Sequence, residues 1–470
     1  MNESFENAPE NNDKNQSVKR FEKMLKNNEF YFFDVDEFED LIDYYLESGE
    51  AKKALDVVEM GCEQHPSSLS LLLYKAQLLA TTHKPQKALE VLSKVESGEP
   101  NNMDVYLIKA TVYSQLREYK KAIDSYHACL KLANKGETED LYISLAFEYE
   151  NLDDYKTAIV YLKKTLELNP ENETALYEIG FCFDVKEICE EGIAFFKNFI
   201  EEHPYSHASW YNMGLLYNKL ELQRKAISCF DFSLAIKDDF SSAWFNKGNS
   251  YSKLGAYIKA IDSYKMTIEI DGADGTTFFH IANCYEALEN NDLALNYYHK
   301  SIIADPYFGD SFLNLGFLYE EMGRLNEGIH YVKRALDLDP KQPDYLLAYG
   351  SIQIRMGFYT EGLDAFEEVI NINEDHPIAW SLYAHGLYAS GDVEKSFQII
   401  LEAIERYPRN PSNYYMLAAN LFRDDRKEEG LHELEKGLSL SPEDHEKFLN
   451  FYPKGAKDLD VLDLISKYSK

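Results

Sequence analysis

Residues 275–308 read GTTFFHIANCYEALENNDLALNYYHKSIIADPYF, and their pattern returns every 34 residues in both directions along the chain. Within this stretch Phe278 is followed by the small residue Ala282, then by Tyr285, and later by a second small residue, Ala294. A fixed period of this length is typical of a solenoid of helical hairpins, in which each hairpin buries its apolar face against its neighbours.

The register extends over residues 35–444 and gives twelve repeats in a chain of 470 residues. One interval is 36 residues long instead of 34, and its two extra residues fall in 134–138, between predicted helices. An insertion there adds little loop-closure entropy. The predicted repeats start at residues 35, 69, 103, 139, 173, 207, 241, 275, 309, 343, 377 and 411.

Position 20 of the repeat carries a small residue in every copy. A large side chain there would hold the second helix of the hairpin away from the first, so the pattern predicts close helix packing. The residues are Ala54, Ala88, Ala122, Ala158, Gly192, Ala226, Ala260, Ala294, Gly328, Gly362, Ser396 and Gly430.

Glycine and asparagine predict where each hairpin closes, because both residues are common at helix C-termini. These signals occur at Gly49, Gly255, Asn290–Asn291, Gly323, Gly357 and Gly391. Proline at position 32, as in Pro306 and Pro340, predicts the end of the second helix.

These positions together resemble the tetratricopeptide repeat (TPR) family, with a large residue at position 4, small residues at 8 and 20, Tyr at 11 and Pro at 32. The resemblance implies an all-α fold, a right-handed TPR superhelix (an α–α solenoid) whose first helices line a concave groove. It says less about function, because a fold does not determine an activity.

The two ends are expected to cap the array, since terminal repeats need a polar outer face. We expect a disordered N-terminus over 1–16 and a capping helix within 17–34, with Ser17 as its N-cap and the aromatic run 30–33 packed under the first repeat. Residues 445–470 are expected to form C-terminal capping helices.

Composition limits the classes of partner. Against 48 basic residues stand 81 acidic ones, and the net charge of −33 argues against nucleic acid and anionic membranes. The six cysteines form no CxxC pair and are interpreted as buried apolar residues in a reducing compartment. The start of the chain lacks a secretory h-region, and no apolar stretch could span a membrane, so we expect a cytoplasmic protein.

No catalytic motif is present: the sequence lacks a P-loop, GxGxxG after a strand, HExxH, GxSxG and an EF-hand loop. We therefore expect no enzyme activity, no cofactor and no metal site. The alternatives are a regulatory or targeting subunit of a separate catalytic partner and, more remotely, an enzyme with its site in the groove.

Asparagine recurs at positions that the family resemblance places in the groove. This pattern resembles the asparagine ladder in the TPR superhelix of protein O-linked N-acetylglucosamine transferases, whose catalytic half is absent here. Amide side chains can bond an extended peptide backbone whatever its side chains, although solvated asparagines on an exposed face would look the same in sequence. The predicted peptide-binding residues are Asn212, Lys219, Asn246, Asn249, Lys253, His280, Asn283 and Asn314.

Charge distinguishes the same region. Residues 207–260 hold seven basic and four acidic residues, whereas residues 34–50 hold eight acidic residues and no basic one. Apolar or aromatic residues at position 5, such as Phe245 and Phe279, argue against the clamp with which other TPR modules bind the C-terminal carboxylate of chaperones. We expect a protein-binding scaffold or adaptor that holds an extended segment of a protein partner.

Overall fold

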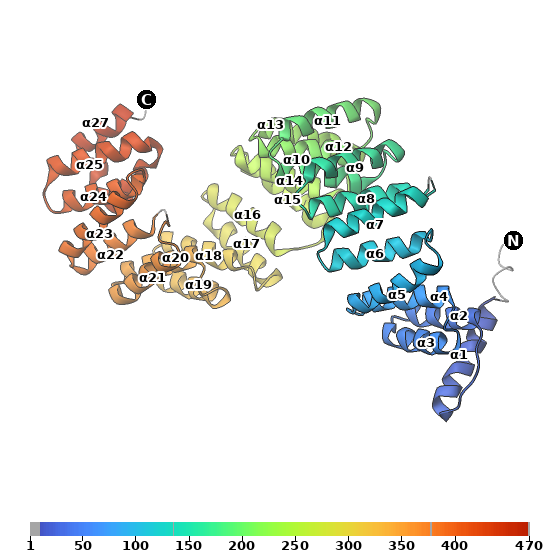
Figure 1. The fold of residues 1–470 in the computed structure, drawn as a ribbon. Helices are drawn as coiled ribbons and strands as arrows, with labels where there is room; N and C mark the ends of the chain where they lie inside the picture. The colour runs from blue at the N-terminus through green and yellow to red at the C-terminus, as the bar shows by residue number, and fades with distance from the viewer. Residues whose placement is uncertain (1–9, 135, 377, 469–470) are drawn as a thin grey trace. The chain divides into compact units, whose positions relative to one another are not determined.

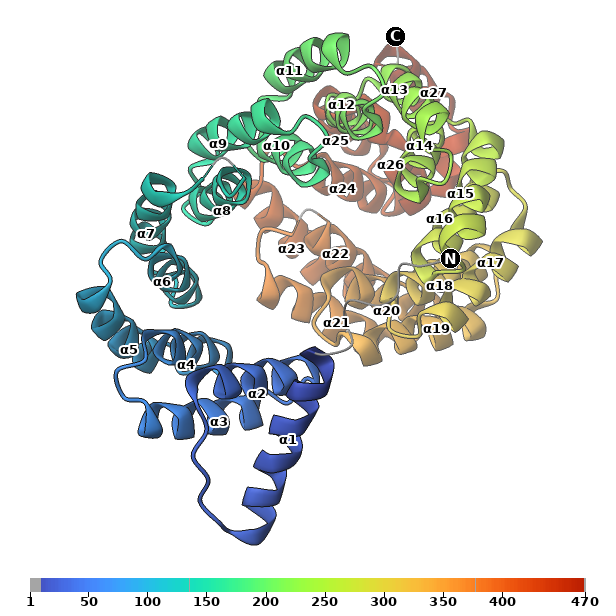
Figure 2. The same cartoon turned by 90° about the vertical axis from the view of Figure 1, so that its right-hand side faces the viewer.

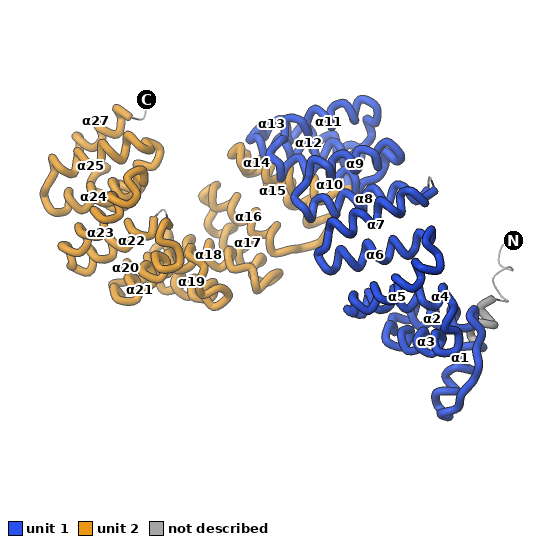
Figure 3. The backbone as a smooth tube through the Cα atoms, in the orientation of Figure 1, with its two compact units in different colours: residues 1–238 blue, residues 239–470 orange. Residues whose placement is uncertain are grey.

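The computed structural model describes residues 10–134, 136–376 and 378–468, with the side chains of 10–15 left aside. Within these residues the regular structure is helical: α-helices and two short 3-10 helices, without a strand. This confirms the all-α fold class. By their contacts the residues form two compact units, one ending at Asp238 and one beginning at Asp239, shown in blue and orange in Figure 3. We describe each unit by itself.

Unit 1 contains the N-terminal helix and the first six helical hairpins (Figure 1). Its helices are α1 (Glu10–Asn27), α2 (Val35–Glu47), α3 (Ala51–Gln64), α4 (Leu69–Thr81), α5 (Pro85–Gly98), α6 (Met103–Gln115), α7 (Tyr119–Leu132), α8 (Thr138–Glu150), α9 (Tyr155–Leu168), α10 (Glu173–Val185), α11 (Cys189–Glu202), α12 (His207–Lys219) and α13 (Gln223–Ile236).

Unit 2 contains the other six hairpins and the C-terminal helices (Figure 2). Its helices are α14 (Ser241–Lys253), α15 (Tyr257–Asp271), α16 (Gly275–Ala287), α17 (Asn291–Ala304), α18 (Gly309–Glu321), α19 (Leu325–Leu338), α20 (Pro343–Met356), α21 (Tyr359–Ile372), α22 (Ala379–Ser390), α23 (Val393–Arg406), α24 (Pro411–Arg423), α25 (Lys427–Leu440), η1 (Pro442–Asp444), α26 (His445–Phe451), η2 (Pro453–Lys457) and α27 (Leu459–Tyr468).

The first helix of each hairpin begins at or near a repeat start read from the sequence. Ten of the twelve starts coincide with the first residue of a helix, while α8 begins one residue early at Thr138 and α22 two residues late at Ala379. The first residue of the repeat at 377 lies outside the described residues.

Small residues mark the closest approach of the two helices in a hairpin. A Cβ added to Gly316 of α18 would lie 2.6 Å from Cγ2 of Val332 and 3.2 Å from the carbonyl oxygen of Gly328. A Cβ added to Gly328 of α19 would in turn lie 3.0 Å from the carbonyl oxygen of Gly316. Positions 8 and 20 therefore face each other across the hairpin, which is the packing reason for their small side chains.

The turn inside each hairpin has one backbone conformation whatever its sequence. Position 15 has a positive φ in every repeat, and glycine occupies it at Gly49, Gly255, Gly323, Gly357 and Gly391. The other seven repeats place a side chain in this left-handed region at φ of 55–59°: His83, Arg117, Asp153, Glu187, Glu221, Glu289 and Asp425. The predicted turn at Asn290–Asn291 is wrong by one residue, because Glu289 takes the left-handed conformation.

The N-terminal helix differs from the sequence prediction. Helix α1 begins at Glu10, so residues 10–16 are helical and Ser17 lies inside the helix instead of capping it. The rest of the segment predicted to be disordered, residues 1–9, lies outside the described residues.

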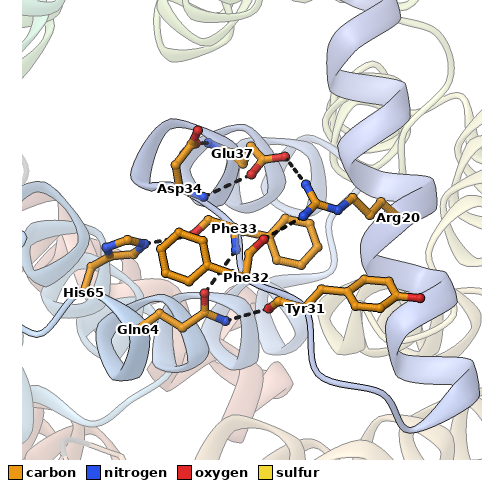
Figure 4. A network of polar contacts seen from close by, with 8 residues as sticks. All are labelled: Arg20, Tyr31, Phe32, Phe33, Asp34, Glu37, Gln64 and His65. Carbon is orange, nitrogen blue, oxygen red and sulfur yellow. Dashed lines mark hydrogen bonds and ion pairs between the residues drawn. The ribbon is translucent and has the colours of Figure 1, made fainter.

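A polar network holds the segment between α1 and α2 (Figure 4). Gln64 donates to the carbonyl oxygen of Tyr31 at 3.0 Å and accepts from the backbone N–H of Phe33 at 3.1 Å. Arg20 donates to the carbonyl oxygen of Phe32 at 2.7 Å. Phe33 is fully buried, but Phe30 is 80% and Phe32 62% exposed, so only part of the aromatic run packs under the first repeat.

The C-terminal helices cover the last hairpin of unit 2. Phe448 of α26 and Val461 and Ile465 of α27 are buried in one cluster with residues of α24 and α25. Lys427 of α25 forms an ion pair with Asp458 at 2.9 Å, just before α27 begins. These contacts cover the apolar face that the last repeat would otherwise expose.

Candidate peptide-binding face

The predicted peptide-binding residues lie on first helices, in both units. Helix α12 of unit 1 carries Asn212 and Lys219. The others lie in unit 2, on three successive first helices: Asn246, Asn249 and Lys253 on α14, His280 and Asn283 on α16, and Asn314 on α18.

Asn212 does not fit the predicted ladder. Its side chain is only 3% exposed, and its amide nitrogen donates to the carbonyl oxygens of Ala208 at 2.8 Å and Leu176 at 3.1 Å. The second bond reaches α10, where the absence of a side chain at Gly180 makes room for the amide. Asn212 therefore joins two first helices and offers no free donor to a ligand.

The two lysines differ in their surroundings. Lys219 lies 3.4 Å from Oδ1 of Asp184 on α10, and both side chains are about half exposed. Lys253 is exposed at the end of α14, and no ion pair holds it within the described part of the chain. Lys253 is thus available to a negatively charged or carbonyl group of a ligand, whereas Lys219 would first have to leave Asp184.

Asn249 is oriented by a buried tyrosine. The hydroxyl of Tyr264 on α15 donates to Oδ1 of Asn249 at 2.8 Å. Tyr264 is 1% exposed, so its hydroxyl needs an acceptor inside the protein. Oδ1 is held in this way, whereas the amide nitrogen of Asn249 has no hydrogen bond to another described residue.

The same arrangement recurs one repeat later. The hydroxyl of Tyr298 on α17 donates to Oδ1 of Asn283 at 2.5 Å, and the amide nitrogen of Asn314 donates to the same oxygen at 3.2 Å. Oε2 of Glu286 lies 2.5 Å from the same hydroxyl, so the single hydrogen of Tyr298 is shared between Asn283 and Glu286. Oδ1 of Asn283 therefore faces two donors, Tyr298 and Asn314, and the amide nitrogen of Asn283 has no hydrogen bond to another described residue.

Asn246 and His280 are less available. The amide nitrogen of Asn246 donates to the carbonyl oxygen of Ser242 at 2.9 Å. The ring of His280 stacks on Tyr264 at a centroid distance of 5.6 Å and meets Phe245 edge-on at 5.2 Å. Burial lowers the pKa of His280, so at neutral pH it contributes an uncharged aromatic surface.

The role of the tyrosines at position 24 was not predicted from the sequence. Asn occupies position 9 only in the two repeats that start at 241 and 275, and both have Tyr at position 24. Tyr occurs at position 24 in one further repeat, as Tyr126, and position 9 of that repeat is Thr111 instead of Asn. The pairing of a buried Tyr with a polar residue fifteen positions earlier is the signal that could have revealed these contacts.

The described residues were also compared with the requirements of a metal site, a disulfide and a membrane span. They contain no group of three or more His, Cys, Asp or Glu side chains placed to hold a metal ion. All six cysteines are free thiols, five of them buried. A search of the described helices for a stretch long and apolar enough to cross a membrane finds none.

Comparison with known proteins gives the following similarities. A sequence model described as tetratricopeptide repeat matches residues 241–274, and a second model with the same description matches residues 104–135, 139–172 and 309–342. No curated protein is similar enough in sequence to count as a match.

Several solved structures are similar. YrrB, described as a TPR protein with an unusual peptide-binding site, is 21% identical over 39% of this chain and 95% of its own, with a TM-score of 0.32. A chain of the APC/C hetero-tetramer Cut9–Hcn1 is 14% identical over 92% of this chain and 90% of its own, with a TM-score of 0.42. A tetratricopeptide repeat protein from Parabacteroides merdae is 15% identical over 53% of this chain and 98% of its own, with a TM-score of 0.41.

The four matched segments begin at, or one residue after, repeat starts read from the sequence, and each is built as one hairpin of two antiparallel helices. The chain is therefore a tetratricopeptide repeat protein.

Proposed function

We propose that this protein is a non-catalytic scaffold or adaptor that holds an extended segment of a protein partner along α14, α16 and α18. Tetratricopeptide repeat proteins generally mediate protein–protein interactions. The observation that carries the more specific proposal is the pair Asn249 and Asn283, whose amide oxygens are both held by buried tyrosine hydroxyls.

Two amide donors at the same position of successive repeats suit the backbone of an extended peptide. Each amide nitrogen can donate to a peptide carbonyl oxygen, which every residue type possesses. Because the tyrosines already fix the amides, binding loses less side-chain entropy than it would with freely rotating asparagines. The exposed ammonium group of Lys253, one turn beyond Asn249 on α14, adds a further donor.

The variant Asn249→Asp tests this proposal. Aspartate keeps an oxygen that accepts from Tyr264 but loses the amide donor, so folding should be retained while binding weakens. Peptides would be selected on the full chain from a phage-displayed library of random dodecamers, and their Kd values measured by fluorescence anisotropy. We expect about fivefold weaker binding, the effect of one lost hydrogen bond.

Asn296→Asp is the matched control, because Asn296 is exposed on the second helix α17 and its replacement adds the same charge. Its Kd values should equal those of the unmodified protein. If every selected peptide binds Asn249→Asp as tightly as the unmodified protein, the amide ladder does not hold the ligand.

A further inference from the structure

Two first helices of unit 1 expose apolar side chains to solvent. On α8 Phe147 is 38% exposed, and on α10 Phe181 and Val185 are 50% and 40% exposed. Phe147 and Phe181 occupy position 9 of successive repeats, the place that Asn249 and Asn283 occupy in unit 2. Exposed apolar side chains at equivalent positions of successive repeats are typical of an interaction surface.

Two carboxylates flank these side chains. Glu150 follows Phe147 by three residues and Glu178 precedes Phe181 by three, so each shares a helix face with its phenylalanine. The thiol of Cys182, one turn after Glu178, donates to Oε1 of Glu150 at 3.3 Å. This bond holds the carboxylate of Glu150 against α10, where the negative charge of Glu178 acts on it.

Both carboxylates are partly withdrawn from water. Burial, with a smaller contribution from the charge of Glu178, raises the pKa of Glu150 to about 7. Burial alone raises the pKa of Glu178. A carboxylate in such surroundings is ionised at a cost in free energy unless a cation approaches it.

No lysine or arginine of the described chain neutralises these two carboxylates. Neither Glu150 nor Glu178 forms an ion pair with a described residue, whereas Asp184 on the same helix α10 pairs with Lys219. Lys186, at the end of that helix, lies over the ring of Tyr155 at 5.0 Å from its centroid. The pair of carboxylates is therefore open to a cation from another molecule.

We propose that the face of α8 and α10 binds a partner segment in which a lysine or arginine adjoins an apolar side chain. The cationic group would lie between Glu150 and Glu178, and the apolar side chain on Phe147, Phe181 and Val185. The aliphatic stem of lysine or arginine also packs on aromatic rings while its charged end reaches a carboxylate. This inference shares with the proposed function only the idea that the chain binds peptide segments. The site on α8 and α10 lies in unit 1, whereas the site on α14, α16 and α18 lies in unit 2.

The test compares selections from one random dodecamer library on the full chain and on Glu150→Gln/Glu178→Gln. Glutamine retains an oxygen that can accept from Cys182, and circular dichroism would verify folding. We expect dodecamers with a cationic residue beside an apolar one to be enriched about tenfold more on the unmodified protein. The matched control is Glu190→Gln/Glu191→Gln, which changes the net charge equally at two exposed positions of α11.

Equal loss of cationic dodecamers in both double variants would assign their binding to the overall acidity of the chain and overturn the proposal. So would a selection without cationic enrichment on the unmodified protein. Phe181→Ser should lose the same dodecamers without a change in charge. Asn249→Asp leaves α8 and α10 intact, so it tests the proposed function separately. Loss of binding in Asn249→Asp concerns the unit 2 site alone, and loss of cationic dodecamers in Glu150→Gln/Glu178→Gln concerns the unit 1 site alone.

Discussion

Tyr264 donates its buried hydroxyl to Oδ1 of Asn249 at 2.8 Å, which ties a second helix of the solenoid to the exposed face of a first helix. The contact recurs between Tyr298 and Asn283. A buried tyrosine hydroxyl requires a hydrogen-bond acceptor. The burial of Tyr264 therefore determines the orientation of the amide oxygen of Asn249.

Tyr264→Phe should weaken both stability and peptide binding. The ring still packs, but the lost hydroxyl removes one net hydrogen bond of about 1 kcal/mol and leaves the amide of Asn249 free to rotate. Urea denaturation and the Kd values of selected dodecamers measure the two effects. Tyr297→Phe on α17 is the control, since its half-buried ring stacks on Tyr285 and its hydroxyl forms no hydrogen bond with another described residue. Unchanged Kd values in Tyr264→Phe would show that amide orientation is irrelevant.

Gly316→Ala should destabilise the protein, although alanine is the better helix former by about 1 kcal/mol. The new methyl group would lie 2.6 Å from Cγ2 of Val332, so the two helices must separate, at a cost of about 1–3 kcal/mol. The midpoint of urea unfolding reports the change. Gly136→Ala, where an added Cβ meets nothing within 4 Å, should leave the midpoint nearly unchanged. A midpoint of Gly316→Ala at or above that of the unmodified protein would contradict the packing role of position 8.

Glu187→Gly should stabilise the protein. Glu187 has a φ of 55° in the turn between α10 and α11, and a left-handed conformation costs a residue with a Cβ about 1 kcal/mol. Part of this gain is offset by the greater freedom of glycine in the unfolded chain. Thermal unfolding followed by circular dichroism would test the sign. Glu90→Gly, inside α5, should have the opposite effect because glycine is a poor helix former.

Glu150→Gln should remove part of the pH dependence of stability. Burial raises the pKa of Glu150 from its ordinary value of 4.5 to about 7, so the folded protein holds this proton more tightly than the unfolded chain does. Its favourable contribution is complete below pH 4.5 and is lost as the pH rises to about 7. Glu178 and Cys182 of α10 and Tyr155 of α9 face the same group, and the thiol and phenol remain neutral in this range.

The stability gained by Glu150→Gln should therefore be larger at pH 8 than at pH 5. We expect a difference of about 1 kcal/mol, less than the full pKa shift would give because the carboxylate is partly solvated. Urea titrations at the two pH values measure it, with Glu190→Gln as the control at an exposed position. A gain that is the same at both pH values would show that Glu150 is ionised at pH 5 already.

The candidate site was only partly predictable. Family position placed Asn249, Asn283 and Asn212 together in the groove, but position alone does not distinguish a solvent-facing amide from one that turns inward. Asn212 turns inward because Gly180 leaves space beside the carbonyl oxygen of Leu176. Asn249 and Asn283 have their oxygens held by tyrosines fifteen residues later, a distance that only the closed hairpin spans.

The sequence by itself determined the hairpin, its period and the points where its helices cross. Each hairpin packs its two helices in the same way, so the same residue types recur at the same positions. Position 20 is small in every repeat since two backbones meet there. Only the tertiary structure revealed the features that depend on contacts between residues far apart in the sequence. These are the left-handed backbone of Glu187, the burial of Asn212, and the proximity of Glu150 to Cys182 and to the charge of Glu178. Such contacts join different helices, and their geometry follows from how side chains fill the space between them.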